Sequence, residues 1–310
     1  QNFLLSPSIV DRRTVSNDPT SEGVRLSKVH LEWTPGEVVL KDISLAVQTG
    51  SLVAVVGPVG SGKSTLLSAL LGELEMISGT VSLIAGSIGY VPQQPWVINA
   101  TLRENILVGA VFEKERYERA VEVSCLGPDL EALPAGDSTE IGERGINLSG
   151  GQKQRVCIAR AVYSNSNLYV LDDPLSAVDS HVAQHIFNRG IMGAMAQSTR
   201  VLVTHRLDLV RNVPHIVVLG DKCIIAQGSY AELVAQGVDM GIHEDSSEDG
   251  SQVAGDIDMS HVSSDIDMLH AIDMSHAQRG AEVEVDTHTH ADRQNLADTS
   301  AHIISSPSPV

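Results

Sequence analysis

The segment Gly57–Ser64, with the sequence GPVGSGKS, constrains the fold of this chain more than any other stretch. The run before it, Leu52–Val56, is apolar at every position, as in a strand that is covered on both faces of a sheet. The residues after it, Leu66–Leu74, are mostly good helix formers. A glycine-rich loop between a strand and a helix is the context that a phosphate-binding loop requires, so we predict that this loop holds the phosphates of a nucleotide.

The spacing within the loop has a physical reason. Glycines at 57, 60 and 62 let backbone N–H groups converge on the β- and γ-phosphates, and the following helix directs its positive end toward them. Lys63 supplies a point charge for the γ-phosphate, and the hydroxyl of Ser64 is a ligand for Mg²⁺. The predicted nucleotide-binding residues of the loop are Gly57, Pro58, Val59, Gly60, Ser61, Gly62, Lys63, Ser64 and Thr65.

The negative charge of the chain is concentrated at one end. Of the net charge of −18, residues 241–310 carry −12, from fourteen acidic and two basic side chains, which leaves −6 for residues 1–240. Without a basic face to neutralise phosphates along a strand, a role in nucleic-acid binding is not expected.

The acidic end also differs in composition. It has few aromatic residues, many Ser, Asp and His residues, and an imperfect repeat of the type DIDMSH that begins at Asp256, Asp265 and Ala271. Such a segment buries too little apolar surface to offset its chain entropy, so we predict a disordered linker over 241–310. The alternative is a weak metal site of His, Met and Asp, although the repeat offsets of nine and six residues fix no coordination geometry.

Composition and hydrophobic periodicity divide residues 1–240 into two parts. Residues 1–22 have no sustained period and are predicted to be a connecting segment, and residues 23–240 to be one domain. The absence of a run of eighteen apolar residues predicts no membrane-spanning helix, and a chain that starts at Gln1 suggests a piece of a longer protein. The three dispersed cysteines, Cys125, Cys157 and Cys223, are expected to be reduced and buried rather than paired.

A second phosphate-reading motif lies at Asn147–Arg155, NLSGGQKQR, before the helical pattern of Val156–Tyr163. At a helix N-terminus, Ser149 and the backbone of Gly150 and Gly151 can approach a γ-phosphate. The phosphate loop of the same chain already surrounds its own nucleotide, so we predict that a nucleotide is sandwiched between two domains of this kind.

Together these motifs resemble the nucleotide-binding domain of ABC transporters. The resemblance covers about Val24–Gly237, with the motifs in the expected order. The resemblance implies that the nucleotide is ATP and that Leu168–Asp173 is the second phosphate-binding signature, in which Asp172 holds Mg²⁺. It also implies that Ser176–Asp179 is a communication loop between paired cassettes. His205 would be the switch residue that contacts the γ-phosphate. The signature residues would complete the nucleotide site of the second cassette. They are Leu148, Ser149, Gly150, Gly151 and Gln152.

Two further residues are assigned from the same resemblance. Gln93, in Tyr90–Trp96, is similar to the glutamine that reaches Mg²⁺ and the attacking water and whose flanks contact the membrane domain; Gln94 is a rival for that role. Trp33 resembles the aromatic side chain that stacks on adenine, which is reasonable because a π-face recognises any purine. The alternative for Trp33 is a half-buried strand aromatic.

The subfamily follows from four segments, which resemble the first cassette of the C subfamily, the multidrug-resistance-associated type: Val91–Trp96, Thr101–Leu107, Gly142–Ser149 and Asp172–Asp179. In that subfamily one polypeptide carries two membrane domains and two unlike cassettes. The implied partners are the second nucleotide-binding domain and the cytoplasmic loops of the membrane domains, at the cytoplasmic face of a membrane that this chain meets only through its parent protein. The acidic segment from Gly241 fits the linker that follows the first cassette.

The residue after the Mg²⁺ carboxylate is Asp173, where a hydrolytically competent cassette would carry Glu. The shorter side chain withdraws the carboxylate by about 1.5 Å, which predicts poor positioning of the attacking water. The chain's own site is therefore expected to bind ATP and hydrolyse it slowly, while its signature completes the site of the partner. The alternatives are an autonomous ATPase and a soluble ABC protein of repair or translation.

The order of the motifs predicts an α/β fold, the P-loop NTPase fold of ABC cassettes. It comprises a mainly parallel core sheet, an antiparallel β subdomain near the N-terminus and an α-helical subdomain from about Pro95 to Tyr163, followed by the disordered acidic tail. The main helices of the α-helical subdomain are expected at Glu113–Cys125 and Ser149–Tyr163.

Overall fold

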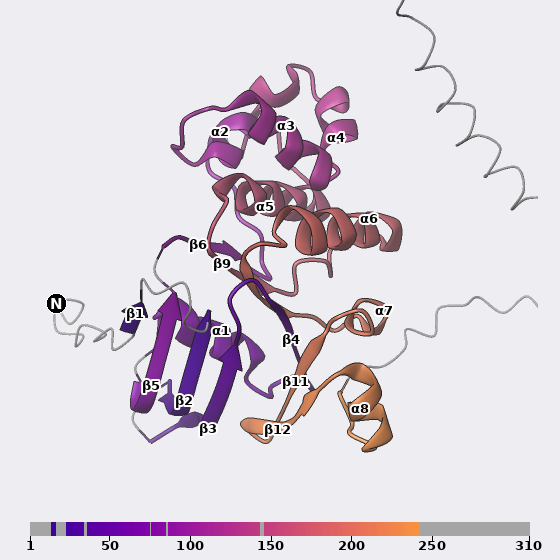
Figure 1. Ribbon diagram of the computed structural model, residues 1–310. Coiled ribbons are helices and arrows are strands. Elements are labelled where there is room, and N and C mark those ends of the chain that lie inside the picture. The colour runs from indigo at the N-terminus through magenta and orange to yellow at the C-terminus, as the bar shows by residue number, and fades with distance from the viewer. Residues whose placement is uncertain are drawn as a thin grey trace, which may run out of the picture. The chain divides into compact units, whose positions relative to one another are not determined.

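A six-stranded sheet in the order β12-β11-β4-β10-β9-β6 forms the centre of the computed structural model (Figure 1). Its strands are β4 (Leu52–Val56), β6 (Ile88–Val91), β9 (Leu168–Asp172), β10 (Thr199–Val203), β11 (His215–Gly220) and β12 (Cys223–Gly228). Neighbouring strands are parallel except β11 and β12, which pair antiparallel at one edge. The prediction of a mainly parallel core sheet is confirmed.

The apolar run in β4 is explained by burial on both faces of this sheet. Leu52, Ala54 and Val56 belong to one hydrophobic core, whereas Val53 and Val55, which point the other way, belong to a second. All five side chains are at most 2% exposed. A strand without a solvent-facing side shows no polar alternation, which is why its sequence reads as a continuous apolar run.

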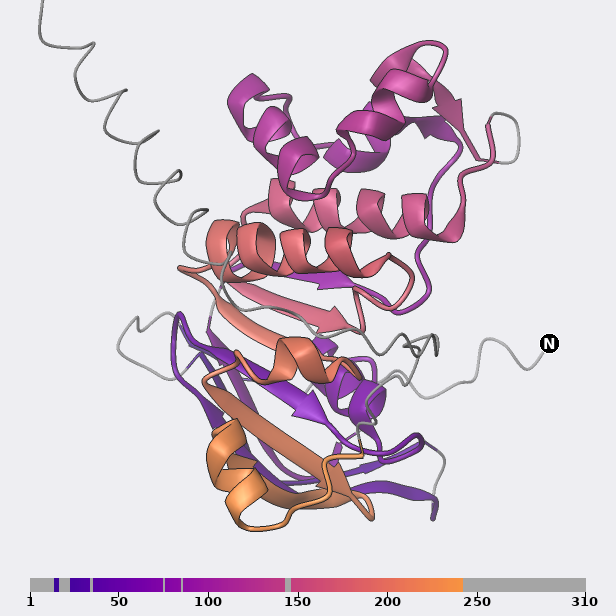
Figure 2. The ribbon, with the colours of Figure 1, turned by 90° about the vertical axis from the view of Figure 1, so that its right-hand side faces the viewer.

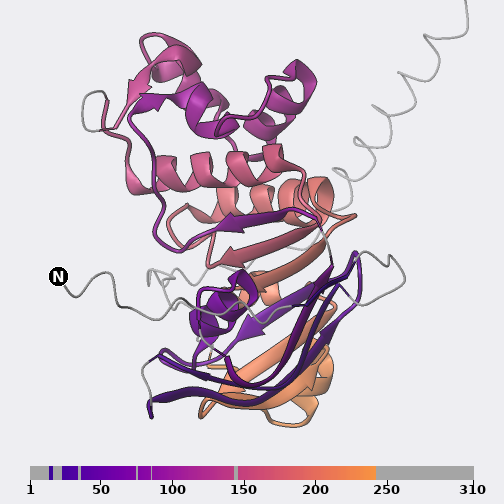
Figure 3. The same cartoon turned by 90° about the vertical axis from the view of Figure 1, so that its left-hand side faces the viewer.

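A second sheet packs against the second core, in the order β1-β5-β2-β3. Its strands are β1 (Thr14–Ser16), β2 (Val24–Glu32), β3 (Val38–Val47) and β5 (Met76–Ile84). β2 pairs antiparallel with both β3 and β5, whereas β1 runs parallel to β5. Helix α1 (Lys63–Leu71) lies between the two sheets and buries Leu66, Leu67 and Leu70 there (Figure 3).

The helical layer covers the other face of the central sheet. Helices α5 (Gly150–Ser164) and α6 (Ser180–His185) lie between the sheet and the helices α2, α3 and α4 (Figures 1 and 2). The remaining elements of the layer are β7 (Ala100–Thr101), α2 (Leu102–Leu107), α3 (Lys114–Val123), α4 (Gly127–Ala132), a 3₁₀ turn (Gly136–Ser138), β8 (Glu140–Ile141) and a π-helix (Ile186–Ala194) that continues α6. Two short helices follow β10 and β12: α7 (Leu207–Val210) and α8 (Tyr230–Ala235). The predicted α-helical subdomain is present, with α3 and α5 near the expected bounds.

Arg200, on β10, ties three parts of the fold together. Its side chain is buried, with 6% exposed, and it donates to the backbone oxygens of Ser198 (3.0 Å), Ile191 (2.7 Å) and Gly50 (2.9 Å). Burial lowers the pKa of this guanidinium. Backbone carbonyls thus stabilise a cation that is taken out of water.

The structure describes residues 14–16, 23–33, 36–74, 76–84, 86–142 and 146–241. Strand β1 falls within the segment predicted to be a connection, and the predicted linker beyond Gly241, with its DIDMSH repeats, lies outside the described residues. Of the described helices, none combines the length and the apolarity needed to cross a membrane. The three cysteines are unpaired; Cys157 is buried as expected, but Cys125 and Cys223 are only partly buried, which corrects that expectation.

Candidate nucleotide-binding site

Four neighbouring strands bring the predicted site residues to one edge of the central sheet. Strands β4, β10, β9 and β6 are adjacent and parallel, so their carboxyl ends lie along the same edge. The chain leaves β4 into the phosphate loop, β9 into Asp173, β10 toward His205 and β6 toward Gln93. Residues that are far apart in the sequence therefore line one edge.

The phosphate loop needs glycine for conformation and for packing. Gly57, Gly60 and Gly62 have φ of 146°, 81° and 100°, a region that side-chain-bearing residues rarely adopt. A Cβ on Gly57 would collide with the backbone oxygen of Leu219, and one on Gly62 would lie 2.6 Å from the Cδ2 of Leu40. Gly60 has no neighbour within 4 Å of that position, so the crest of the loop is open to solvent.

Lys63 begins α1 and folds back onto the loop. Its Nζ donates to the carbonyl oxygens of Gly57 at 2.8 Å and Pro58 at 2.9 Å. Burial lowers the pKa of Lys63, and the charges of Asp173 and Asp172 oppose this effect. The N-terminus of α1 carries neither a side-chain cap nor an acidic residue in its first turn. Its free N–H groups and its positive end are thus directed at the loop, where an anion is stabilised.

Asp172 lies at the end of β9, the strand that contacts α1. Only 6% of its surface is exposed, and its carboxylate lies beside the hydroxyl of Ser64. Burial raises the pKa of Asp172, and the neighbouring Ser64 hydroxyl counteracts the rise. A carboxylate and a hydroxyl side by side are oxygen ligands of the kind that Mg²⁺ prefers.

This pair fits a cation that is shared with a ligand. Among the described residues, no group of three or more His, Cys, Asp or Glu side chains is arranged to hold a metal ion. Mg²⁺ commonly binds through one or two protein oxygens and completes its shell with phosphate oxygens and water. Ser64 and Asp172 are therefore suited to a cation that arrives with a phosphate ligand, and not to a protein-only metal centre.

Asp173 occupies an unusual position directly after Asp172. Its φ of 44° lies in the left-handed region, its N–H donates to the carbonyl oxygen of Val203 at 2.9 Å, and 5% of its surface is exposed. Its carboxylate lies near the backbone N–H of His205, while its Oδ1 is buried with no hydrogen-bond partner in the described part of the chain. Burial raises the pKa of Asp173, and the neighbouring His205 opposes that rise.

The two glutamines and Trp33 are placed less tightly. Gln93 and Gln94 are both exposed, so their burial does not choose between them. Trp33 follows β2, is 57% exposed and is not packed as a strand aromatic. It lies close to the strand that touches the phosphate loop, because Glu32 pairs with Val38 on β3 and Leu40 of that strand contacts Gly62.

Tyr90 was missed by the sequence reasoning. It lies on β6, and burial raises the pKa of its phenol, with further contributions from the negative charges of Asp172 and Glu73. The side chain therefore lies near the carboxylate that pairs with Ser64. The available signal was a tyrosine on the strand that leads into Gln93.

The signature motif forms the N-terminus of α5. Ser149 is the N-cap: its Oγ accepts from the N–H of Gln152 at 3.2 Å, and its own N–H donates to the Oε1 of Gln152 at 2.9 Å. Ser149 and Gly150 are exposed, whereas Leu148 is buried and anchors the turn. A Cβ on Gly151 would lie 2.9 Å from the backbone oxygen of Ala177, so the signature touches the predicted communication loop.

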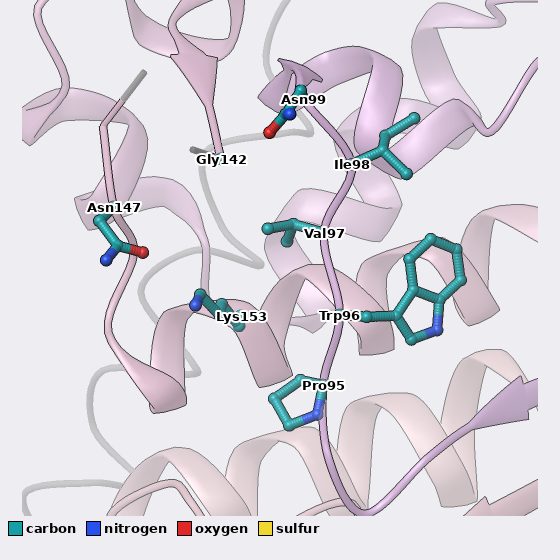
Figure 4. A pocket seen from close by; sticks show the side chains of 8 residues that line it. All are labelled: Pro95, Trp96, Val97, Ile98, Asn99, Gly142, Asn147 and Lys153. Atoms are coloured by element: carbon teal, nitrogen blue, oxygen red, sulfur yellow. The ribbon is translucent and has the colours of Figure 1, made fainter. Parts of the chain in front are cut away.

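A pocket of about 600 Å³ lies between this helix and the segment after Gln93. Its lining residues are Pro95, Trp96, Val97, Ile98, Asn99, Gly142, Asn147 and Lys153. Figure 4 shows Val97 and Asn99 pointing toward the side of Asn147 and Lys153, while the indole of Trp96 points the opposite way. The segment after Gln93 and the start of the signature helix therefore line the same pocket.

The last described residue lies against the phosphate loop. Gly241 has φ of 61°, and a Cβ there would be 2.5 Å from the backbone nitrogen of Pro58 and 2.8 Å from the carbonyl carbon of Gly57. The return of the chain from α8 therefore ends in backbone contact with the loop.

Residues 40–176 match the protein family described as ABC transporter. Domains of this family bind ATP and hydrolyse it. Its similarity is to sub-family C. The chain is 50% identical over 241 residues to ATP-binding cassette sub-family C member 3 of Rattus norvegicus, an alignment that covers 76% of this chain and 16% of that protein.

Two other similar proteins also have names of the C family. Identity is 50% over 218 residues with ATP-binding cassette sub-family C member 2 of Homo sapiens, covering 69% of this chain and 14% of that protein. It is 48% over 236 residues with ABC transporter C family member 12 of Dictyostelium discoideum, covering 75% of this chain and 18% of that protein. The chain thus matches less than a fifth of the length of these relatives.

Proposed function

We propose that this chain is the first ATP-binding cassette of a C-subfamily transporter and couples the binding and hydrolysis of Mg-ATP to substrate export. The observation that carries the proposal is the juxtaposition of the Ser64 hydroxyl and the buried carboxylate of Asp172, at the foot of an open glycine loop. It joins the phosphate loop to the second phosphate-binding signature, the two parts that hold a nucleotide and its cation.

The residues divide the work of binding ATP. The loop amides and Lys63 would bind the phosphates once Nζ leaves the carbonyl oxygens of Gly57 and Pro58. Ser64, Asp172 and Gln93 would hold Mg²⁺, which neutralises charge on the β- and γ-phosphate oxygens when it is bound. The exposed indole of Trp33 offers a face on which adenine can stack.

Asp173 would set the rate of hydrolysis. Its buried carboxylate has a raised pKa, and its Oδ1 has no hydrogen-bond partner among the described residues. A raised pKa makes a carboxylate a stronger base, but the side chain reaches one methylene less far than Glu would, and water activation depends on geometry first. We therefore expect slow turnover at this site, with His205 as a second contact to the γ-phosphate.

The signature would serve another nucleotide. Ser149 and Gly150 are exposed at a helix N-terminus, and Gly151 contacts the communication loop. This exposed face suits the phosphate of a nucleotide that is held by a second cassette, stacked head to tail on this one. The other partners would be the cytoplasmic loops of the membrane domains, reached through the flanks of Gln93, at the cytoplasmic face of a membrane.

The test is ATP binding and phosphate release by the purified chain with Mg²⁺, for the native sequence and for Asp173→Glu. Tight binding with negligible release, increased at least tenfold by Asp173→Glu, is the expected result for a weak site with a misplaced carboxylate. Asp173→Asn is the control, because it keeps the shape and removes the base. Rapid release by the native chain would favour an autonomous ATPase instead. The identities to sub-family C proteins weigh against a soluble protein of repair or translation.

A further inference from the structure

Asp129 joins the first turn of α4 to the signature helix. Its carboxylate accepts hydrogen bonds from Arg155, from Nε at 2.9 Å and from Nη2 at 2.8 and 2.7 Å, and from Nε2 of Gln152 at 3.0 Å. The side chains of Arg155 and Asp129 are 16% and 11% exposed, so the pair is largely shielded from water. A bidentate, shielded pair with a further hydrogen bond is geometrically well defined, unlike most exposed ion pairs.

The contact with Gln152 determines which way its amide points. A carboxylate accepts hydrogen bonds and cannot donate them, so it selects the amide orientation in which Nε2 faces Asp129. The opposite end of the same amide, Oε1, then faces the N–H of Ser149 and accepts from it at 2.9 Å. If the amide were reversed, two donors would meet at Ser149 and the reciprocal cap of α5 would be lost.

We propose that Asp129 is a positioning residue for the signature motif. By orienting Gln152 and holding Arg155, it fixes the N-cap Ser149 and the first amides of α5 in the geometry that receives the γ-phosphate of the nucleotide on the partner cassette. This inference rests on the proposed function, because it assumes that the signature acts on a nucleotide. Asp129 itself acts through Gln152 and does not touch that nucleotide.

The chain supplies a matched control for the loss of a carboxylate. Asp137, on the 3₁₀ turn, accepts from Nε and Nη2 of Arg103 on α2, both at 2.8 Å, and these side chains are 18% and 45% exposed. Asp129→Asn and Asp137→Asn remove the same charge from the same kind of pair in the same layer. Only the first change affects the orientation of Gln152.

The experiment measures ATP turnover as a function of ATP concentration in the whole transporter that carries this cassette. Asp129→Asn is expected to lower kcat/KM by about 10- to 100-fold, the effect of a misplaced group of this kind, while Asp137→Asn leaves it within about twofold of native. The Kd for ATP at this chain's own phosphate loop should stay unchanged in both variants. The double variant Asp129→Asn with Gln152→Glu presents a carboxylate oxygen to the Ser149 N–H again, and it should recover part of the lost turnover.

Hydrogen exchange of the peptide that contains Ser149 gives a second measurement, which remains readable if turnover is lost altogether. Exchange should be faster in Asp129→Asn and unchanged in Asp137→Asn. Ser149→Ala distinguishes failure of the positioning role of Asp129 from failure of the proposed role of the signature. If Ser149→Ala lowers turnover and Asp129→Asn changes neither kcat/KM nor exchange, the positioning role is wrong and the proposed function stands. If Ser149→Ala leaves turnover unchanged, the proposed role of the signature is itself wrong, and this inference is overturned with it.

Discussion

Arg160 stacks on Trp96, with its guanidinium carbon 3.8 Å from the centroid of the indole ring. Its Nη2 also donates to the backbone oxygen of Trp96 at 3.4 Å, and its Nε donates to that of Asn105 at 2.9 Å. Arg160 lies on α5, the helix that begins just after Ser149, and Trp96 lies three residues after Gln93. One arginine therefore attaches the glutamine segment to the signature helix.

We expect Arg160→Met to release Trp96. The chain has two tryptophans, so a Trp33→Phe background leaves Trp96 as the only indole fluorophore. Loss of a cation–π contact of about 0.5–1 kcal/mol and of two hydrogen bonds should shift the emission to longer wavelength and increase quenching by acrylamide. Arg119→Met, a change at an exposed position of α3, is the control. Identical quenching in the two variants would contradict the stacked arrangement.

Lys63→Met should separate nucleotide binding from folding. Removing a charged donor to the phosphates is expected to raise the Kd for ATP by about 100-fold, as measured by calorimetry. The melting temperature should fall less than in Arg200→Met, because Lys63 donates to two backbone oxygens and not three, and burial disfavours its charged form. Lys114→Met, at a lysine whose side chain is 77% exposed, should leave the Kd unchanged. A Lys63→Met protein that binds ATP with native affinity would remove Lys63 from the site.

Asp173→Asn should stabilise the protein in a pH-dependent way. Because the pKa of Asp173 is raised above its ordinary value of 3.8 in the folded state, its ionisation lowers stability as the pH rises from that value through the raised pKa. The variant cannot ionise and should be more stable than the native chain at pH 7, by a difference that shrinks toward zero below pH 3.8.

Thermal unfolding at the two pH values, without Mg²⁺ and nucleotide, measures the effect of Asp173→Asn. The matched control is Asp42→Asn, because Asp42 is exposed and has a similar left-handed backbone with φ of 49°. A gain of equal size in both variants would mean that asparagine merely suits this backbone conformation. A gain at Asp173 that does not depend on pH would contradict the ionisation argument.

Arg200→Met should be the most destabilising of these changes. It leaves three backbone oxygens without their donor, at an expected cost of about 3 kcal/mol or roughly 6–12 °C in Tm. Arg200→Lys should recover part of this stability, since an ammonium can reach some of the same oxygens. A native Tm for Arg200→Met would show that these hydrogen bonds contribute little.

The sequence was most informative where one short segment carries both the local structure and the chemistry. The phosphate loop could be located because Leu52–Val56, the glycines and the start of α1 follow one another directly. The helix at Ser149 could be predicted for the same reason. The edge that gathers Asp173, His205 and Gln93 followed from family resemblance, and the parallel order of the strands accounts for it physically.

Contacts between distant segments could not be predicted in this way. Asp129 meets Gln152 across twenty-three residues, and nothing in the local pattern around Asp129 indicates it. The pairing of β1 with Ser82–Ile84 of β5 is equally non-local, which is why Thr14–Ser16 was predicted as connection. Burial of the cysteines depends on packing as well: Cys157 faces the core from α5, Cys125 packs against the margin of that core, and Cys223, at the start of β12, is partly buried.

The backbone contact between Gly241 and the Gly57–Pro58 peptide has a mechanical consequence. Gly241 has no side chain and the ring of Pro58 has little rotamer freedom, so the contact cannot absorb a displacement by rotamer changes, and a loop that shifts to admit phosphate must either carry Gly241 along or lose the contact. Where the contact holds, occupancy of the loop would set the position of residue 241, which follows α8 in the sequence.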